Sequence, residues 1–143
     1  MNVATRTLFE PNHMKSYLTQ KNLHLIISIL VIIPAGFMYG LFPEKVLPQL
    51  LDIQTFSVDL IHIFRAIMCL YFGIAGVWIL GVLRPDYWRF ATILAMVFMG
   101  CLMAGRIISF IFDGIPSLLF TLGVMGECVL AVFSWYQLKR YAA

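Results

Sequence analysis

The stretch RIISFIFDGIPSLLFTLGVMGE, residues 106–127, decides the fold of this chain. It holds two apolar runs joined by Asp-Gly-Ile-Pro, residue types that end one helix and allow another to begin. An arginine stands at its first position and a glutamate at its last. The stretch therefore predicts a helical hairpin in which two charged side chains, Arg106 and Glu127, lie among apolar ones.

The composition of the whole chain extends this prediction to a membrane protein. Of the 143 residues, 62% are hydrophobic and only 12% are charged, and the mean hydropathy is +0.91; soluble domains carry about 25% charged residues. Because a transmembrane helix needs about 20 apolar residues, we expect an all-α integral membrane four-helix bundle with no second domain. The expected spans are residues 23–42, 59–83, 90–112 and 116–138.

The remaining segments are expected at the membrane surfaces. Residues 1–22 form a cytoplasmic or interfacial N-terminal segment, in which Met14, Tyr17 and Leu18 stand at helical spacing between lysines. The first span follows a long leader that contains Glu10, so we expect it to stay in the mature protein. Residues 43–58 predict a short interfacial helix on the opposite face, and residues 139–143 form a cytoplasmic tail.

The distribution of basic residues predicts the orientation. Seven Lys and Arg residues flank the spans on one side, whereas the other side has only Lys45. The positive-inside rule then places both termini in the cytoplasm. Six aromatic residues fall towards that same face and predict an interfacial belt: Trp78, Trp88, Trp135, Tyr87, Tyr136 and Tyr141.

Helical projections at about 100° per residue predict which faces meet inside the bundle. In the second span one stripe holds His62, Arg65, Cys69, Gly73 and Gly76, and we expect it to face the interior. In the third span a stripe holds Ala95, Met99, Leu102, Arg106, Ser109 and Asp113. In the fourth, the corresponding stripe is Phe120, Gly123, Glu127, Ala131 and Ser134.

The charged residues on these stripes are placed to meet in the outer half of the bundle. An unpaired charge at mid-bilayer costs at least about 2.5 kcal/mol, so we expect Glu127 to pair with Arg106, Arg65 or both. The shallower members of the predicted cluster are Asp59, His62, Ser109 and Asp113. Asp113 has two plausible uses, as a cap for the fourth helix or as a partner of Arg106.

Two interpretations of this cluster stay open. A buried Arg–Glu pair can fix helix register without binding any ligand. Alternatively, two arginines form a pocket for a carboxylate, a phosphate or a quinone oxygen, because ionisable residues inside membranes commonly mark functional sites.

Several other classes of site find no support in the sequence. Cys69, Cys101 and Cys128 lie in apolar runs and fit no zinc or haem-attachment spacing, and His62 has no second ligand at its depth, so no metal and no cofactor are predicted. The net charge of +3 is scattered at helix ends, which argues against nucleic acid as a partner. No nucleophile elbow or phosphate loop occurs, and we assign no catalytic residue.

The chain resembles a family of small bacterial four-helix inner-membrane proteins known only as a domain of unknown function, similar in layout to DoxX-like proteins. The resemblance rests on YGLFPEKVLPQLL, HIFRAIMCLYFGIAGVW, MAGRIISFIFDGIPS and GECVLAVFSWY, and it covers roughly residues 25–138. It implies a location in the bacterial inner membrane but no activity. The residues it marks as defining are Arg106, Ser109, Asp113, Gly114, Pro116 and Glu127.

These observations favour a non-catalytic role. The first hypothesis is an accessory subunit of a larger membrane complex, or a protein that binds a lipid-like or anionic small molecule through the Arg/Glu cluster. The alternatives are a small proton-coupled transporter that uses Glu127 and acts as an oligomer, and a quinone-linked redox membrane protein. The expected partners are membrane lipids, together with a larger complex or further copies of the chain.

Overall fold

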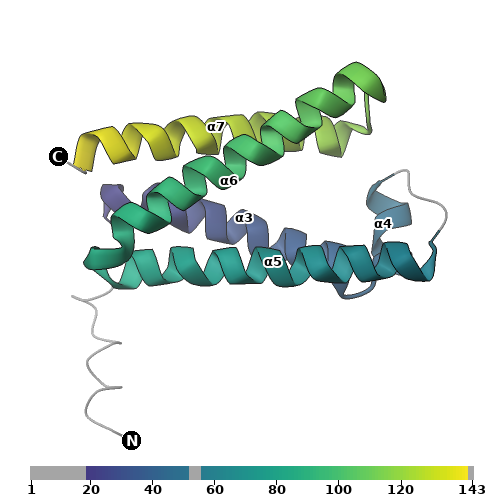
Figure 1. Ribbon diagram of the computed structural model, residues 1–143, viewed down its shortest axis with the longest axis horizontal. Coiled ribbons are helices and arrows are strands. Elements are labelled where there is room, and N and C mark those ends of the chain that lie inside the picture. Colours follow the sequence, from purple (N-terminus) through teal and green to yellow (C-terminus); the bar gives the residue numbers. More distant parts are fainter. Residues whose placement is uncertain (1–18, 52–55, 142–143) are drawn as a thin grey trace, which may run out of the picture.

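The computed structural model describes residues 19–51 and 56–141, and this part of the chain is all-α (Figure 1). The predicted helix within residues 9–22 lies mostly outside the described residues. In chain order the elements are the 3-10 turn η1 (Gln20–Asn22), α3 (Leu23–Gly40), α4 (Pro43–Leu50), α5 (Val58–Leu83), α6 (Pro85–Phe112) and α7 (Leu118–Tyr141). Four of them, α3, α5, α6 and α7, are long and apolar enough to cross a membrane.

Local sequence explains where these helices begin and end. The Ser57 side chain caps α5 by accepting a hydrogen bond of 3.1 Å from the amide of Leu60. Asp113 ends α6, and Gly114 follows with a φ of +94°, a left-handed conformation that residues with a Cβ rarely adopt. The chain therefore reverses at Gly114, and α7 runs back along α6.

The connection between α5 and α6 is shorter than expected. Residues 84–89 were predicted to form a loop, but α6 begins at Pro85 and only Arg84 separates the two helices. Pro85 suits the first turn because an amide N–H at that position would have no intrahelical acceptor, so its absence costs nothing. The negative charge of Asp86 in the same turn is stabilised by the positive end of the helix dipole. This tight connection holds the end of α5 against the start of α6.

The four long helices form two hairpins that meet at one end. α3 packs along α5, and α6 packs along α7, whereas α3 has few contacts with α6 and α7. Figure 1 shows α6 starting beside α5 and running obliquely away from it. In keeping with this divergence, the buried residues of α6 all lie between Trp88 and Met99, and none lies in the last 13 residues of the helix.

The end where the hairpins meet, which we call the closed end, is held by hydrogen bonds between helices. His24 of α3 and Thr92 of α6 are fully buried, and His24 Nε2 lies 3.0 Å from Thr92 Oγ1. Because the Thr92 hydroxyl donates its hydrogen to the carbonyl of Trp88 (2.8 Å), it accepts from His24. Gln137 of α7 donates to the carbonyl of Gln20. Three of the four long helices thus begin or end in one polar layer.

Two residues assigned to the aromatic belt lie in the core instead. Trp78 is fully buried and meets Phe98 edge-on at 5.8 Å, and Trp88 is 3% exposed against His24. The sequence pattern placed both at the correct end of the bundle, but their large apolar rings fill the space between the hairpins. Trp135 and Tyr136 are exposed at this end.

The hydrogen bond between His24 and Thr92 predicts a stability effect. Thr92→Val keeps the shape of the side chain but leaves the His24 N–H without an acceptor, so it should lower the free energy of unfolding by about 1–3 kcal/mol. The control is Thr121→Val, because the Thr121 hydroxyl bonds only to the Ser117 carbonyl of its own helix turn. Unfolding of both variants in mixed micelles measures the difference; equal losses would contradict the prediction.

A second prediction concerns Gly81, which is buried where α5 meets α6. A Cβ added there would fall onto the Cβ of Ala91, and neither carbon can move without its backbone. Gly81→Ala should therefore destabilise the protein by about 1–3 kcal/mol. Gly76→Ala meets only open space, so it is expected to keep the wild-type melting temperature or raise it; equal melting temperatures for the two variants would refute close packing at Gly81.

Candidate functional site

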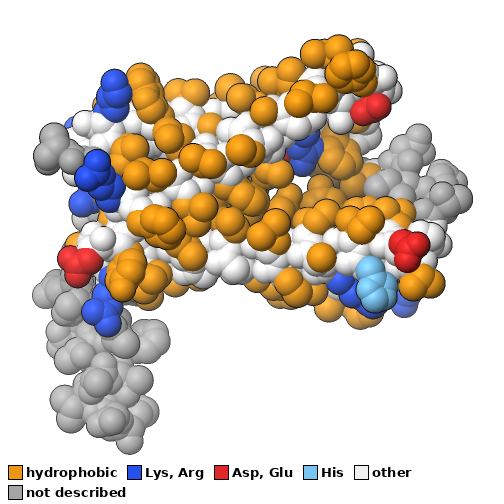
Figure 2. Space-filling model, in the orientation of Figure 1, with side chains coloured by type: hydrophobic (Ala, Val, Ile, Leu, Met, Phe, Trp, Pro, Cys, Tyr) orange, Lys and Arg blue, Asp and Glu red, His pale blue; other side chains and the backbone are white. Residues whose placement is uncertain are grey.

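Where the two hairpins diverge, they enclose a cleft of about 740 Å³. Its walls come from α3, α5, α6 and α7, and Leu51, which follows α4, also lines it. Figure 2 shows the molecule hollowed between α5 and the far half of α6, with apolar side chains around the opening. A cavity of this volume with an apolar lining and few polar groups is typical of sites for small ligands.

The charged groups of the cleft are Arg106 of α6 and Glu127 of α7. Arg106 Nε donates to Glu127 Oε1 at 3.0 Å, and the guanidinium carbon lies 4.6 Å from the centre of the Phe120 ring. Glu127 is 9% exposed, and Arg106 is partly buried. The predicted pairing of these two residues is therefore present in the structure.

The ion pair leaves hydrogen-bonding capacity unused. Within the described chain, Arg106 Nη1 and Glu127 Oε2 are buried and have no hydrogen-bond partner. About a fifth of the Arg106 side chain and a tenth of the Glu127 side chain stay accessible, and both residues line the cleft. Unsatisfied polar atoms in an apolar setting are costly, so the pair favours a further polar partner.

Two tyrosines contribute hydroxyl groups from the other hairpin. Tyr39 of α3 and Tyr71 of α5 line the same cleft, and their rings meet edge-on with centres 6.0 Å apart. Tyr39 also stacks on Phe64, and Tyr71 meets Phe98 edge-on. Neither hydroxyl has a hydrogen-bond partner among the described residues. Two donors that also accept thus face the same cleft as the ion pair.

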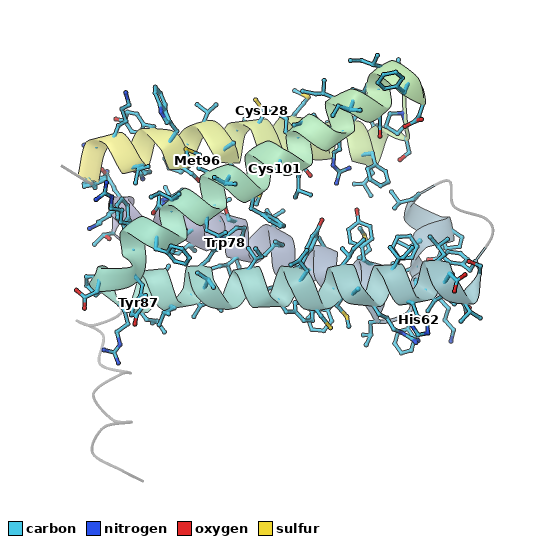
Figure 3. The ribbon with its side chains drawn as sticks, in the orientation of Figure 1. His62, Trp78, Tyr87, Met96, Cys101 and Cys128 are labelled. Atoms are coloured by element: carbon cyan, nitrogen blue, oxygen red, sulfur yellow. The ribbon has the colours of Figure 1, made fainter. Side chains whose placement is uncertain are left out.

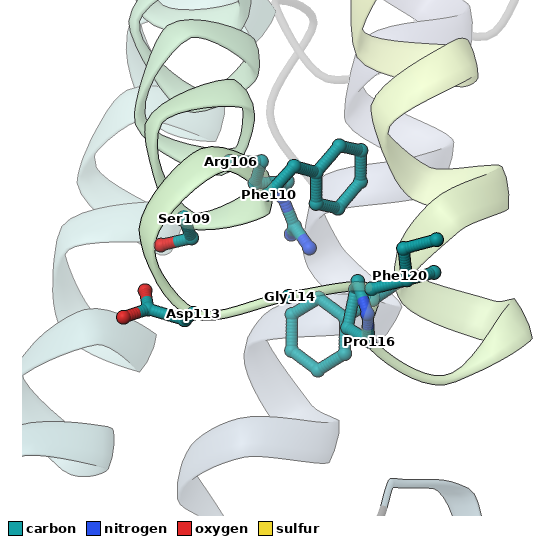
Figure 4. A pocket seen from close by; sticks show the side chains of 8 residues that line it. Arg106, Ser109, Phe110, Asp113, Gly114, Pro116 and Phe120 are labelled. Carbon is teal, nitrogen blue, oxygen red and sulfur yellow. The ribbon is translucent and has the colours of Figure 1, made fainter.

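Arg106 also borders a smaller cavity of about 240 Å³ at the turn between α6 and α7. This cavity is lined by Phe110, Pro116 and Phe120 among others. The predicted site residues Ser109 and Asp113 belong to its rim, but their oxygens point away from the Arg106 guanidinium (Figure 4). Asp113 is the C-cap residue of α6, and the ion pair of Arg106 is with Glu127 instead.

The expected inward face of α5 is wrong. His62, Arg65, Cys69, Gly73 and Gly76 are all exposed, and a Cβ at either glycine would meet nothing within 4 Å. Figure 3 shows His62 projecting from the side of α5 that faces away from α6 and α7. Asp59, in the first turn of α5, is also exposed. The residues that α5 buries are Tyr71, Ala75, Trp78 and Gly81.

The reason for this error is the position of the charges along the helix. Arg65 lies seven residues after the start of α5, about 10 Å at 1.5 Å per residue, and a long basic side chain can extend its charge from there towards the helix end. Its charge therefore does not require an inward position. Arg65, His62 and Asp59 are not brought together with the Arg106–Glu127 pair.

Sequence reasoning also missed Tyr39 and Tyr71. A signal was present, because tyrosine usually sits at a membrane surface with its hydroxyl in a polar setting, whereas Tyr71 stands near the middle of α5. A tyrosine at that depth needs a polar neighbour or a polar ligand.

The polar groups of this site are hydrogen-bond donors and acceptors. The site offers guanidinium and hydroxyl donors and carboxylate and hydroxyl acceptors in an apolar cleft, a combination suited to holding a polar group attached to an apolar body. Among the described residues, no three His, Cys, Asp or Glu side chains lie close enough to hold a metal ion.

The pairing of Arg106 with Glu127 predicts strong coupling. Arg106→Leu or Glu127→Leu alone should lower the free energy of unfolding by about 3 kcal/mol, because each strands the partner charge. The double replacement should recover much of this loss, whereas Arg65→Leu should have little effect because Arg65 is exposed. A double variant as unstable as the sum of the two single variants would disprove the coupling.

Comparison with known proteins places the chain in a family. No curated protein and no solved structure matches it significantly. Residues 21–138 match the family model described as "Domain of unknown function (DUF4345)". This match covers α3, α4, α5 and α6 in full and most of η1 and α7, including every residue that lines the cleft. The chain therefore belongs to the DUF4345 family.

Proposed function

We propose that this protein is a non-catalytic, multi-pass protein of the bacterial inner membrane that binds a lipid-like amphiphile in the cleft between its hairpins. α3, α5, α6 and α7 serve as the spans. Both termini lie in the cytoplasm, because the closed end of the bundle carries the basic residues Lys21, Arg84, Arg89, Lys139 and Arg140.

The interface at the closed end fits this orientation. Lys21 lies 4.3 Å from the centre of the Trp88 ring, and Lys139 lies 4.9 Å from that of Trp135. Basic and aromatic side chains together are typical of the boundary between a membrane and the cytoplasm. The cleft then lies in the half of the bundle nearer the outer face.

The observation that carries the proposal is the cleft itself, an apolar cavity of about 740 Å³ with an incompletely satisfied ion pair in its wall. The residues lining it on α7 run from Leu119 to Leu130, about 16 Å along the helix. An apolar chain can lie along this length while its polar group meets Arg106 and Glu127. Apolar side chains exposed on both hairpins, such as Val31 and Val129, border the cleft where it opens towards lipid.

The proposal predicts that filling the cleft displaces a bound molecule. Gly126 lines the cleft, and a Cβ there meets nothing within 4 Å, so Gly126→Phe is chosen to add a ring on the side of α7 that borders the cleft. After extraction into copolymer nanodiscs without detergent, mass spectrometry should find an amphiphile enriched over the bulk lipid with the wild type. Its amount should fall at least about tenfold with Gly126→Phe.

The matched control is Gly73→Phe, which also adds a ring in open space but lies outside the cleft. It should retain the amphiphile at the wild-type level. An identical lipid content in all three proteins would contradict the proposal. A stoichiometric protein partner that co-purifies with an otherwise empty cleft would favour an accessory subunit in its place.

A further inference from the structure

Resting on the proposed function, we infer that the cleft selects an amphiphile whose head is uncharged and both donates and accepts hydrogen bonds, as a hydroxyl group does. The inference narrows the ligand expected from the sequence, which included anions. It depends on the charge balance of the cleft and on the kinds of polar atom that face it.

The charge balance of the cleft is neutral. Among the described residues that line it, Arg106 and Glu127 alone are charged, and they pair with each other at 3.0 Å. The second arginine expected at this site, Arg65, is exposed on another face of α5. An anionic head would therefore meet a cation that is already neutralised by a carboxylate within contact distance.

A charged head would also lose its hydration in the cleft. Transfer of an ion from water into an apolar setting is unfavourable unless an opposite charge compensates it. For a phosphate the nearest cation is shared with Glu127, and for a quaternary ammonium the nearest anion is shared with Arg106. An uncharged head avoids this cost in either case.

The polar atoms of the cleft suit a head that donates and accepts. The guanidinium N–H groups of Arg106 donate and the carboxylate of Glu127 accepts, and both side chains line the cleft with part of their surface accessible. The hydroxyls of Tyr39 and Tyr71 do both and lie on the opposite hairpin. A hydroxyl head can complete both halves of the ion pair at once.

Three photoreactive probes with one alkyl chain and different heads test the inference: hexadecanol, hexadecyl phosphate and hexadecyltrimethylammonium, each with a diazirine at the same carbon. The wild-type protein in phosphatidylcholine nanodiscs is titrated with each probe, and labelled peptides are identified by mass spectrometry. Saturable labelling of the cleft peptides by the alcohol should reach half-maximum at a concentration at least about tenfold lower than for either ion.

Glu127→Gln provides the charge-specific variant. It keeps the size of the side chain but leaves Arg106 without its counter-ion, so the preference should shift towards the phosphate by at least about tenfold. Tyr39→Phe changes no charge and removes one hydroxyl, so it should weaken alcohol labelling about fivefold. This second variant tests the inference even where Glu127→Gln does not fold.

The outcomes separate the two proposals. If no probe labels the cleft saturably, the proposed function fails. If the wild type labels best with the phosphate or the ammonium probe, amphiphile binding stands and the neutral-head inference fails. An alcohol preference that is unchanged in both Glu127→Gln and Tyr39→Phe would place the head elsewhere and would also overturn the inference.

Discussion

The hydrogen bond between His24 and Thr92 is the interaction on which the rest of the structure depends. Lipid tails are as apolar as the side chains of the helices, so the hydrophobic effect does not favour one contact between helices over another. Polar contacts and close packing therefore determine where the helices meet. His24 and Thr92 join α3 to α6 at full burial, and Gln137 joins α7 to η1, just before α3, at the same end. All of these contacts lie at one end of the bundle, and the other end is free to diverge.

Divergence at the far end follows from what the helices carry there. α6 buries nothing beyond Met99, and its later turns present Arg106 to α7 rather than to α5. On the opposite hairpin the large rings of Tyr39 and Tyr71 contact each other and form part of the cleft wall. The hairpins are thus tight within themselves and loosely joined to each other at this end, and the cleft is the space between them.

The sequence predicts much of this arrangement and misses a definable part of it. Hydropathy located the four long helices, and the helical stripes predicted that Glu127 pairs with Arg106, Arg65 or both, of which the structure has the pair with Arg106. The inward face of α5 was not predictable in the same way, because this helix is apolar nearly all round and its buried stripe, Tyr71 to Gly81, carries no charge to mark it. The cleft could not be predicted from the sequence. It lies where the two hairpins do not contact each other, and the residue pattern of a single helix does not show where two pairs of helices separate.

The unequal ends of the bundle explain how an incompletely satisfied ion pair can persist. A charged pair with unpartnered atoms lowers the stability of the fold wherever it is buried, so other contacts must stabilise the fold. At the closed end these contacts are the packing of Trp78 and Gly81 and the hydrogen bond between His24 and Thr92. Binding sites tend to lie in the less stable parts of a structure, and the proposed binding site lies at the opposite end of the four helices from the contacts that hold them together. A ligand that completes the Arg106–Glu127 pair would therefore stabilise the end of the molecule that its own sequence leaves open.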